Sequence, residues 1–214
     1  IQVDNSKGVI LVRNPDFKEV NVGQPAAKIG RIEIAVVPDA QTQVARMMVG
    51  DQDLMYDVPT DVADLMKPNP AIQITTLPSI SFTYLMLDAA DRSGFGHFKD
   101  KRVREAVFSA IDRKALVNAL QPKEIAAMPL QPAMCHPSHI GCASSVQPPS
   151  FDLAKAKALM AEAGKPNGFE LTLTTWGAGR PVAEAVAGQL RRIGVNAKIE
   201  NLTIGGFVTK RAAG

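Results

Sequence analysis

The sequence is poor in the features that mark several large classes of protein. Of its 214 residues only 5% are aromatic, with a single Trp, and the formal net charge is +3. Its Lys and Arg residues are spread along the chain, whereas a nucleic-acid-binding surface clusters them. No apolar run approaches the roughly 20 residues that a membrane-spanning helix requires. We therefore expect no nucleic-acid partner and no membrane span.

Motifs for phosphate binding and for nucleophilic catalysis are also missing. Gly94-Phe95-Gly96 is followed by no Lys-Ser/Thr pair, and Gly205-Gly206 stands alone, so neither predicts a phosphate-binding loop. No Ser lies in a G-x-S-x-G turn, and no His has an evident nucleophile partner. We therefore expect no catalytic residue, no cofactor and no enzymatic activity.

What is present is the composition of a globular protein with a sizeable core. Hydrophobic residues make up 46% of the chain and charged residues 21%, which is ordinary for such proteins. The length suits one large or two small domains.

Strand and helix patterns alternate along the chain. Strands are predicted at residues 9–12, 31–37, 54–58, 71–77, 82–87, 169–175 and 195–202. Helices are predicted at 40–49, 60–66, 99–120, 152–163 and 181–193, with Asp39, Thr60 and Asp152 as N-terminal caps. Residues 121–150 lack periodicity and predict an irregular loop. This alternation predicts an α/β fold.

The strongest single pattern is the amphipathic helix expected at residues 99–120. Val103, Val107, Ala110 and Ile111 fall three and four positions apart and form an apolar stripe. We expect a core where helices cover the later strands, and its predicted members are Val103, Val107, Ile111, Leu159, Leu171 and Leu190.

The same helix carries a resemblance to a known family. Residues 98–117, FKDKRVREAVFSAIDRKALV, closely resemble the signature helix of the family-5 (peptide/nickel-type) extracellular solute-binding proteins. Further similar motifs occur in the family's order: RNPDF at 13–17, VGDQDL at 49–54, DVP at 57–59, DLAKAKAL at 152–159 and IGV at 193–195. Several matches in register across nearly the whole chain identify it as a member of this family.

The resemblance implies a fold and a role. The fold is α/β, the two-lobed type II arrangement of periplasmic binding proteins, with residues 1–80 as part of the first lobe and 81–214 as part of the third. The role is capture of a small polar ligand, such as a peptide, chelate or saccharide, for an ABC permease in the inner membrane. The protein is expected to be a monomer, in the periplasm or as a cell-surface lipoprotein. The alternative is a sensing module with the same fold.

The ends of the chain lead to a further expectation. The sequence begins at Ile1 without the basic and apolar stretches of a signal peptide, and family members are more than twice as long. We expect an excised fragment, from which the removed signal peptide, a second domain and a C-terminal segment are absent.

Two cysteines and two histidines lie together in Cys135-His-Pro-Ser-His-Ile-Gly-Cys142. Such a set could hold zinc, but so short a segment would have to fold back on itself to aim four ligands at one point. In an exported protein, a Cys135–Cys142 disulfide is the simpler expectation. Free thiols are the third alternative.

Two sets of residues are candidates for ligand binding. Trp176, followed by a glycine-rich turn and Arg180, ends a predicted strand, where open α/β sheets place ligand contacts. The Arg180 guanidinium suits a carboxylate, although Trp176 capping the core and a solvated Arg180 would explain the pattern equally well. Ser81, Thr83 and Tyr84 offer hydroxyls at the expected lobe junction. The acidic residues Asp53, Asp57, Asp61 and Asp64 are interpreted as structural.

Overall fold

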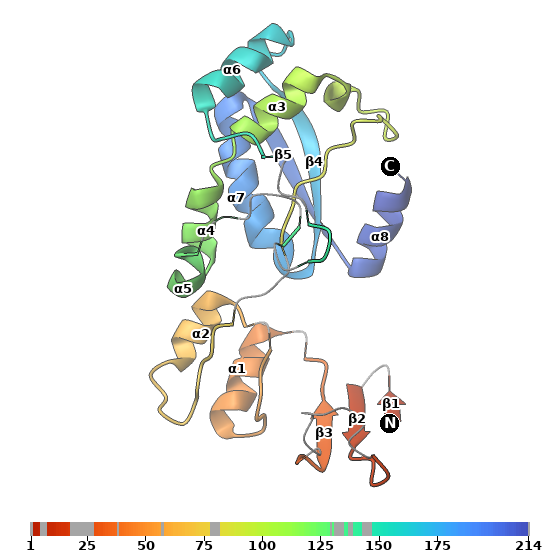
Figure 1. Cartoon of the computed structure of the whole chain (residues 1–214), viewed down its shortest axis with the longest axis vertical. Coiled ribbons are helices and arrows are strands. Elements are labelled where there is room, and N and C mark those ends of the chain that lie inside the picture. The colour runs from red at the N-terminus through yellow and green to blue at the C-terminus, as the bar shows by residue number, and fades with distance from the viewer. Residues whose placement is uncertain are drawn as a thin grey trace. The chain divides into compact units, whose positions relative to one another are not determined.

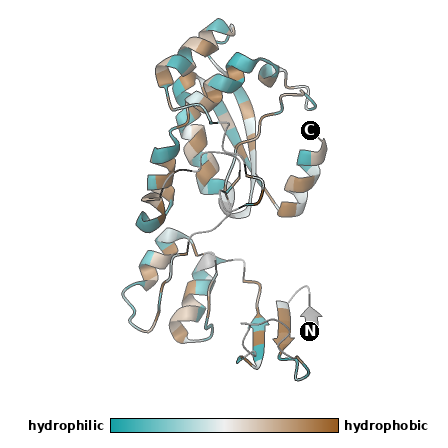
Figure 2. Cartoon of the chain, in the orientation of Figure 1, coloured by the Kyte–Doolittle hydropathy of each residue, from teal (hydrophilic) through white to brown (hydrophobic). Residues whose placement is uncertain are grey.

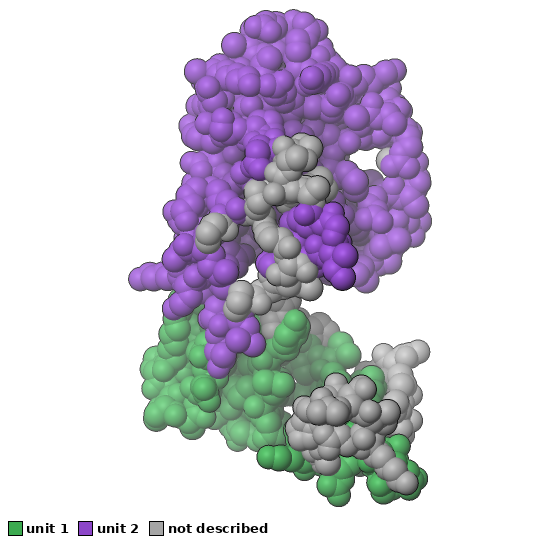
Figure 3. Space-filling view, viewed as in Figure 1, with its two compact units in different colours: residues 1–74 green, residues 75–214 purple. Residues whose placement is uncertain are grey.

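The computed structural model describes residues 2–4, 8–17, 28–37, 39–56, 58–77, 82–128, 130, 135–136, 139–142 and 147–213. The chain divides into two compact units, residues 1–74 and residues 75–214 (Figures 1 and 3). The expected assignment of 1–80 and 81–214 to particular lobes stays a prediction.

The first unit combines a small antiparallel sheet with two helices. The strands β1 (Gln2–Asp4), β2 (Gly8–Val12) and β3 (Arg31–Ile34) lie in the order β1-β2-β3, and the helices are α1 (Ala40–Val49) and α2 (Thr60–Met66). Asp39 caps α1 as predicted, because its Oδ1 accepts from the Thr42 amide at 2.8 Å. Gly50 ends this helix in the left-handed conformation.

Three details predicted for residues 54–77 are wrong. The described residues of 54–58 and all of 71–77 lie outside any strand. A strand needs a neighbouring backbone to satisfy its amides and carbonyls, and no described segment pairs with these residues. Leu54 and Leu77 are accordingly exposed. Thr60 is the first helical residue rather than the cap, and the cap position, Pro59, makes no side-chain hydrogen bond.

The second unit is built on two parallel strands joined by a helical crossover. The strands β4 (Phe169–Trp176) and β5 (Val195–Leu202) pair from Phe169↔Val195 to Trp176↔Leu202. The connection contains the 3-10 turn η2 (Gly177–Gly179), α7 (Arg180–Leu190) and the 3-10 turn η3 (Arg191–Ile193). Gly168 and Gly194, just before the two strands, approach so closely that a methyl group on Gly168 would lie 2.0 Å from the Gly194 oxygen.

Helices before and after this crossover complete the second unit (Figure 1). They are η1 (His97–Lys99), α3 (Lys101–Ser109), α4 (Arg113–Leu120), α5 (Lys123–Ala126), α6 (Leu153–Glu162) and α8 (Ile204–Ala213). The helix α5 interrupts the stretch 121–150, which was predicted to be irregular throughout. Residues 82–87, predicted as a strand, pair with no strand that the structure describes, although Leu85 and Leu87 contact the core.

The predicted helix at 99–120 is two helices, so this prediction is wrong in its continuity. The break lies at Ala110–Asp112, where the Asp112 amide bonds to Gln189 Oε1 at 2.6 Å. Asp112 Oδ1 then accepts from the Ala115 amide at 2.9 Å and caps α4. Contacts with α7 thus replace the hydrogen bonds that would have continued α3.

The core of the second unit confirms most of the predicted apolar stripe. Val103, Val107, Ile111 and Leu190 are buried, while Leu159 and Leu171 are half-buried at the edge of the same cluster. Figure 2 shows the apolar positions of these helices and strands. Among the described residues, no helix has the length and apolar character needed to cross a bilayer.

Candidate functional site

The carboxyl end of the β4–β5 pair presents an exposed aromatic side chain. Trp176 is the last residue of β4 and is 46% exposed, so it does not close the core. The chain then turns through Gly177, which has a positive φ of 50°. A methyl group on Gly179 would lie 2.4 Å from Thr175 Oγ1, so a larger residue here would require the Thr175 side chain to shift. The indole therefore stands at a strand end beside a tight turn.

Arg180 begins α7 directly after this turn. Its Nε donates to Glu184 Oε1 at 2.8 Å, an ion pair one helical turn apart. Both side chains are more than half exposed, and exposed pairs of this kind contribute only about 0–1 kcal/mol. The guanidinium is therefore held near the strand end by a weak, solvent-exposed interaction.

A polar network that the sequence pattern did not predict lies at the same end of the sheet. Thr174 and Glu200 are register partners on β4 and β5, and the Thr174 hydroxyl donates to Glu200 Oε2 at 2.9 Å. Lys210 of α8 forms an ion pair with the same carboxylate. The Lys210 and Thr174 hydrogen bonds lower the pKa of Glu200. The parallel register could have predicted the Thr–Glu pair, but the position of Lys210 depends on how α8 packs.

The second predicted set of ligand residues is only partly described. Thr83 and Tyr84 are exposed, and the Tyr84 ring lies 5.9 Å from that of Phe82. Ser81 lies outside the described residues. These side chains belong to the extended segment whose Leu85 and Leu87 contact the core of the second unit. No hydrogen bond or ring contact given by the structure joins Thr83 or Tyr84 to Trp176 or Arg180.

The cysteine prediction is confirmed, because Cys135 and Cys142 form a disulfide with a Cα–Cα distance of 5.7 Å. The rings of His136 and His139 lie 6.0 Å apart inside this loop, and His139 Nδ1 accepts from the His136 amide at 3.3 Å. With both sulfurs used in the disulfide, the four-ligand zinc set is ruled out. Within the described residues, no three His, Cys, Asp or Glu side chains are grouped as metal ligands.

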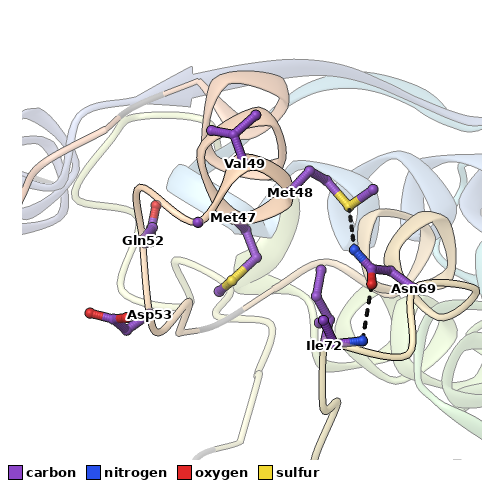
Figure 4. A pocket seen from close by; sticks show the side chains of 9 residues that line it. Met47, Met48, Val49, Gln52, Asp53, Asn69 and Ile72 are labelled. Carbon is purple, nitrogen blue, oxygen red and sulfur yellow. Dashed lines mark hydrogen bonds between the residues drawn. The ribbon is translucent and has the colours of Figure 1, made fainter.

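The first unit contains a pocket of about 430 Å³ between the end of α1 and the segment after α2. Figure 4 shows the Met47 and Met48 side chains on one side and Asn69 and Ile72 on the other. Asn69 Nδ2 donates to Met48 Sδ at 3.7 Å. Asp53 is on the lining, whereas Asp64 pairs with Lys67 and Asp57 lies outside the described residues. The pocket therefore has one carboxylate and the two side-chain amides of Gln52 and Asn69 beside its apolar side chains.

Comparisons with known proteins agree with this architecture. A family model described as bacterial extracellular solute-binding proteins, family 5 Middle, matches residues 2–214. The glutathione-binding protein GsiB of Salmonella typhimurium is 30% identical over 187 residues, which cover 85% of this chain and 35% of that protein. The chain thus spans about a third of the length of the curated relatives it matches.

Solved structures show the same fold at lower sequence identity. DppA of Helicobacter pylori, a periplasmic binding protein in complex with the peptide STSA, is 21% identical with a TM-score of 0.70, and the match covers 98% of this chain and 39% of that one. MoaA of A. tumefaciens R10, in complex with mannopinic acid, is 17% identical with a TM-score of 0.76, and the match covers 95% of this chain and 39% of that one. The predicted type II periplasmic-binding-protein fold, present in part, is confirmed. Because the family model matches residues 2–214, the chain belongs to the family-5 bacterial extracellular solute-binding proteins.

Proposed function

We propose that this chain serves in non-catalytic capture of a small, polar, peptide-like solute outside the cytoplasmic membrane, for delivery to an ABC permease. The family match over residues 2–214 carries this proposal. The similarity to a relative named as glutathione-binding favours a peptide-like ligand over a chelate or a saccharide. We expect the protein to act as a monomer.

The proposed contacts lie at the carboxyl end of the β4–β5 pair. The exposed face of Trp176 suits an apolar or planar part of a peptide. Arg180 would exchange Glu184 for a ligand carboxylate, a charge-assisted contact that can engage two oxygens at once. Ser81, Thr83 and Tyr84 are proposed to add hydroxyl contacts to the peptide backbone.

The energetics of the proposed site require that the ligand be enclosed. An exposed ion pair contributes about 0–1 kcal/mol, whereas micromolar affinity corresponds to about 8 kcal/mol. Binding proteins of two lobes obtain the difference by closing around the ligand and shifting an open–closed equilibrium. This chain alone should therefore bind more weakly than the complete product of its gene.

Calorimetry with glutathione and with a tetrapeptide tests the proposal. In the complete gene product, Trp176→Ala and Arg180→Gln should each weaken binding about tenfold or more, because each removes a contact that the closed site makes. Lys123→Gln, on α5 of the same unit, is the matched control and should change nothing. Unchanged affinity in both site variants would place the site elsewhere.

A fluorescence titration of this chain with the same ligands uses its single Trp as a reporter. Weak binding should change the Trp176 emission only at about millimolar ligand. Micromolar binding by this chain would contradict the expectation that closure supplies most of the affinity.

A further inference from the structure

A pocket of about 340 Å³ lies between α6 and η3, at the end of the β4–β5 pair opposite to Trp176. Gly194, on its lining, directly precedes the first residue of β5. Eight residues of parallel strand span about 25 Å, so this pocket is separate from the proposed solute site. Any role for it is independent of the proposed function.

The α6–η3 pocket is built over residues of the core. Lys157, Met160 and Ala161 line it from α6 at helical spacing, so they share one face of that helix. Met160 and Ile193 are 1% and 3% exposed and belong to the core. Gly194 has a positive φ of 79°, and a methyl group there would lie 2.7 Å from the Asn167 oxygen. The floor of the pocket is therefore part of the packed core, and the exposed Lys157 and Arg192 side chains stand at its rim.

Its charge is positive. Lys157 and Arg192 both line it, and among the described residues no ion pair joins either of them to an acid. The neighbouring Lys155, by contrast, is paired with Glu105 at 2.6 Å. Glu162 is the last residue of α6, and its carboxylate interacts electrostatically with Arg102 of α3. Two cations thus face a pocket without a carboxylate on its lining.

An exposed aromatic ring extends this surface. The Arg192 guanidinium lies 5.4 Å from the centre of the Phe151 ring, a distance at which the cation and the ring attract each other. Phe151 is 41% exposed, and Pro166 adds an apolar lining residue to the pocket. Arg and aromatic side chains around a small pocket are typical of the energetic centre of a protein–protein interface.

We propose that the α6–η3 pocket docks an acidic segment of a partner protein. A carboxylate of that segment lies between Lys157 and Arg192, and an apolar neighbour covers Phe151 and Pro166. A protein fits better than a lipid surface, because sequence-readable recognition of anionic membranes uses clusters of about 4–8 cations and this pocket presents two.

Chemical-shift mapping of this chain with two acetylated, amidated pentapeptides tests the proposal. The acidic probe is Asp-Leu-Glu-Phe-Asp, and the matched neutral probe is Asn-Leu-Gln-Phe-Asn. The acidic peptide should shift the amide signals of Ala161 and Gly194 saturably. The affinity obtained from these shifts should fall about tenfold when salt is raised from about 50 to about 500 mM. The neutral peptide should cause no saturable shift there.

Paired charge reversals provide the control. The double variant Lys157→Glu, Arg192→Glu should weaken peptide binding about tenfold or more. The double variant Lys123→Glu, Arg211→Glu makes the same change in net charge on α5 and α8 and should leave peptide binding unaltered. Thermal unfolding confirms that both variants fold. The proposal is overturned by equal loss in both variants, by shifts centred on Trp176, or by binding to vesicles with 30% anionic lipid but not to the peptide.

Discussion

At the scale of single residues, Asp100 shows how one carboxylate starts a helix and binds a neighbour. Its Oδ1 accepts from the Arg102 amide at 2.8 Å, and its Oδ2 accepts from Arg102 Nη2 at 2.6 Å. These hydrogen bonds, with the side-chain contact contributing most, lower the pKa of Asp100 to about 2. Arg102 also donates to the Glu162 carbonyl at 2.8 Å and so links α3 to the end of α6.

We predict that Asp100 titrates near pH 2 and that Arg102→Met raises this pKa toward the ordinary value of about 4. The folded pKa is depressed, so the stabilisation is complete above the unfolded pKa and is lost as the pH falls from about 4 through about 2. Carboxyl-carbon NMR measures the midpoint directly. A midpoint near 4 in the unaltered chain would contradict the Asp100–Arg102 contact.

Ile111 offers a second test at this scale. Its side chain is 8% exposed at the turn between α3 and α4, so Ile111→Ala should lower the free energy of unfolding by about 2–5 kcal/mol. Ile204→Ala removes the same atoms from a side chain that is 59% exposed and should cost less than about 0.5 kcal/mol. Urea unfolding compares the two, and equal losses would mean that Ile111 is not in the core.

At the scale of elements, α8 is joined to the sheet by polar contacts as well as by partial apolar burial. No described side chain of α8 is buried, and Ile204 and Val208 are largely exposed. Lys210 pairs with Glu200 of β5, and the carbonyl of Arg211 accepts from Arg92 at 3.4 Å. The ion pair with Glu200 is therefore a specific tie between this helix and β5, beside the half-buried Phe207.

We predict that Lys210→Met speeds amide exchange across α8 while leaving β4 and β5 unchanged. Because the folded pKa of Glu200 is lowered, the attachment should be complete above about pH 4.3 and weaken as the pH falls through the folded value. Exchange measured by NMR and corrected for intrinsic rates tests both statements. Arg211→Met is the control, and an equal effect there would show that Lys210 has no special role.

At the scale of the whole molecule, the two units differ in how much they bury. Every residue of the main core cluster belongs to the second unit, whereas the first unit leaves Leu54, Tyr56 and Leu65 more than 60% exposed. The stability of the chain should therefore reside in residues 75–214.

We predict that residues 75–214 fold when produced alone, with a cooperative thermal transition in circular dichroism. The reason is that all buried partners of Val103, Val107 and Leu190 are retained. A broad transition with binding of a hydrophobic dye would instead indicate a loosely packed state and would show that the first unit is needed for the core.

The sequence alone determined the features that depend on local chemistry. The caps Asp39 and Asp152, the strand 195–202 and the stripe of Val103 and Val107 follow from short-range hydrogen bonding and helical periodicity, and the structure has them. The disulfide followed from short spacing together with the exported context that the family motifs imply.

Only the tertiary structure decided the features that depend on distant partners. The break at Ala110–Asp112 involves Gln189, which is 77 residues away from Asp112. Lys210 reaches the Glu200 carboxylate, which Thr174 also contacts, only because α8 folds back against the sheet. Residues 71–77 and 82–87 have strand-like side chains, but a strand exists only where another backbone supplies its hydrogen bonds. Side-chain pattern is local and backbone pairing is not, which is why two strand-like segments of the sequence form no strand and why the break between α3 and α4 could not be predicted.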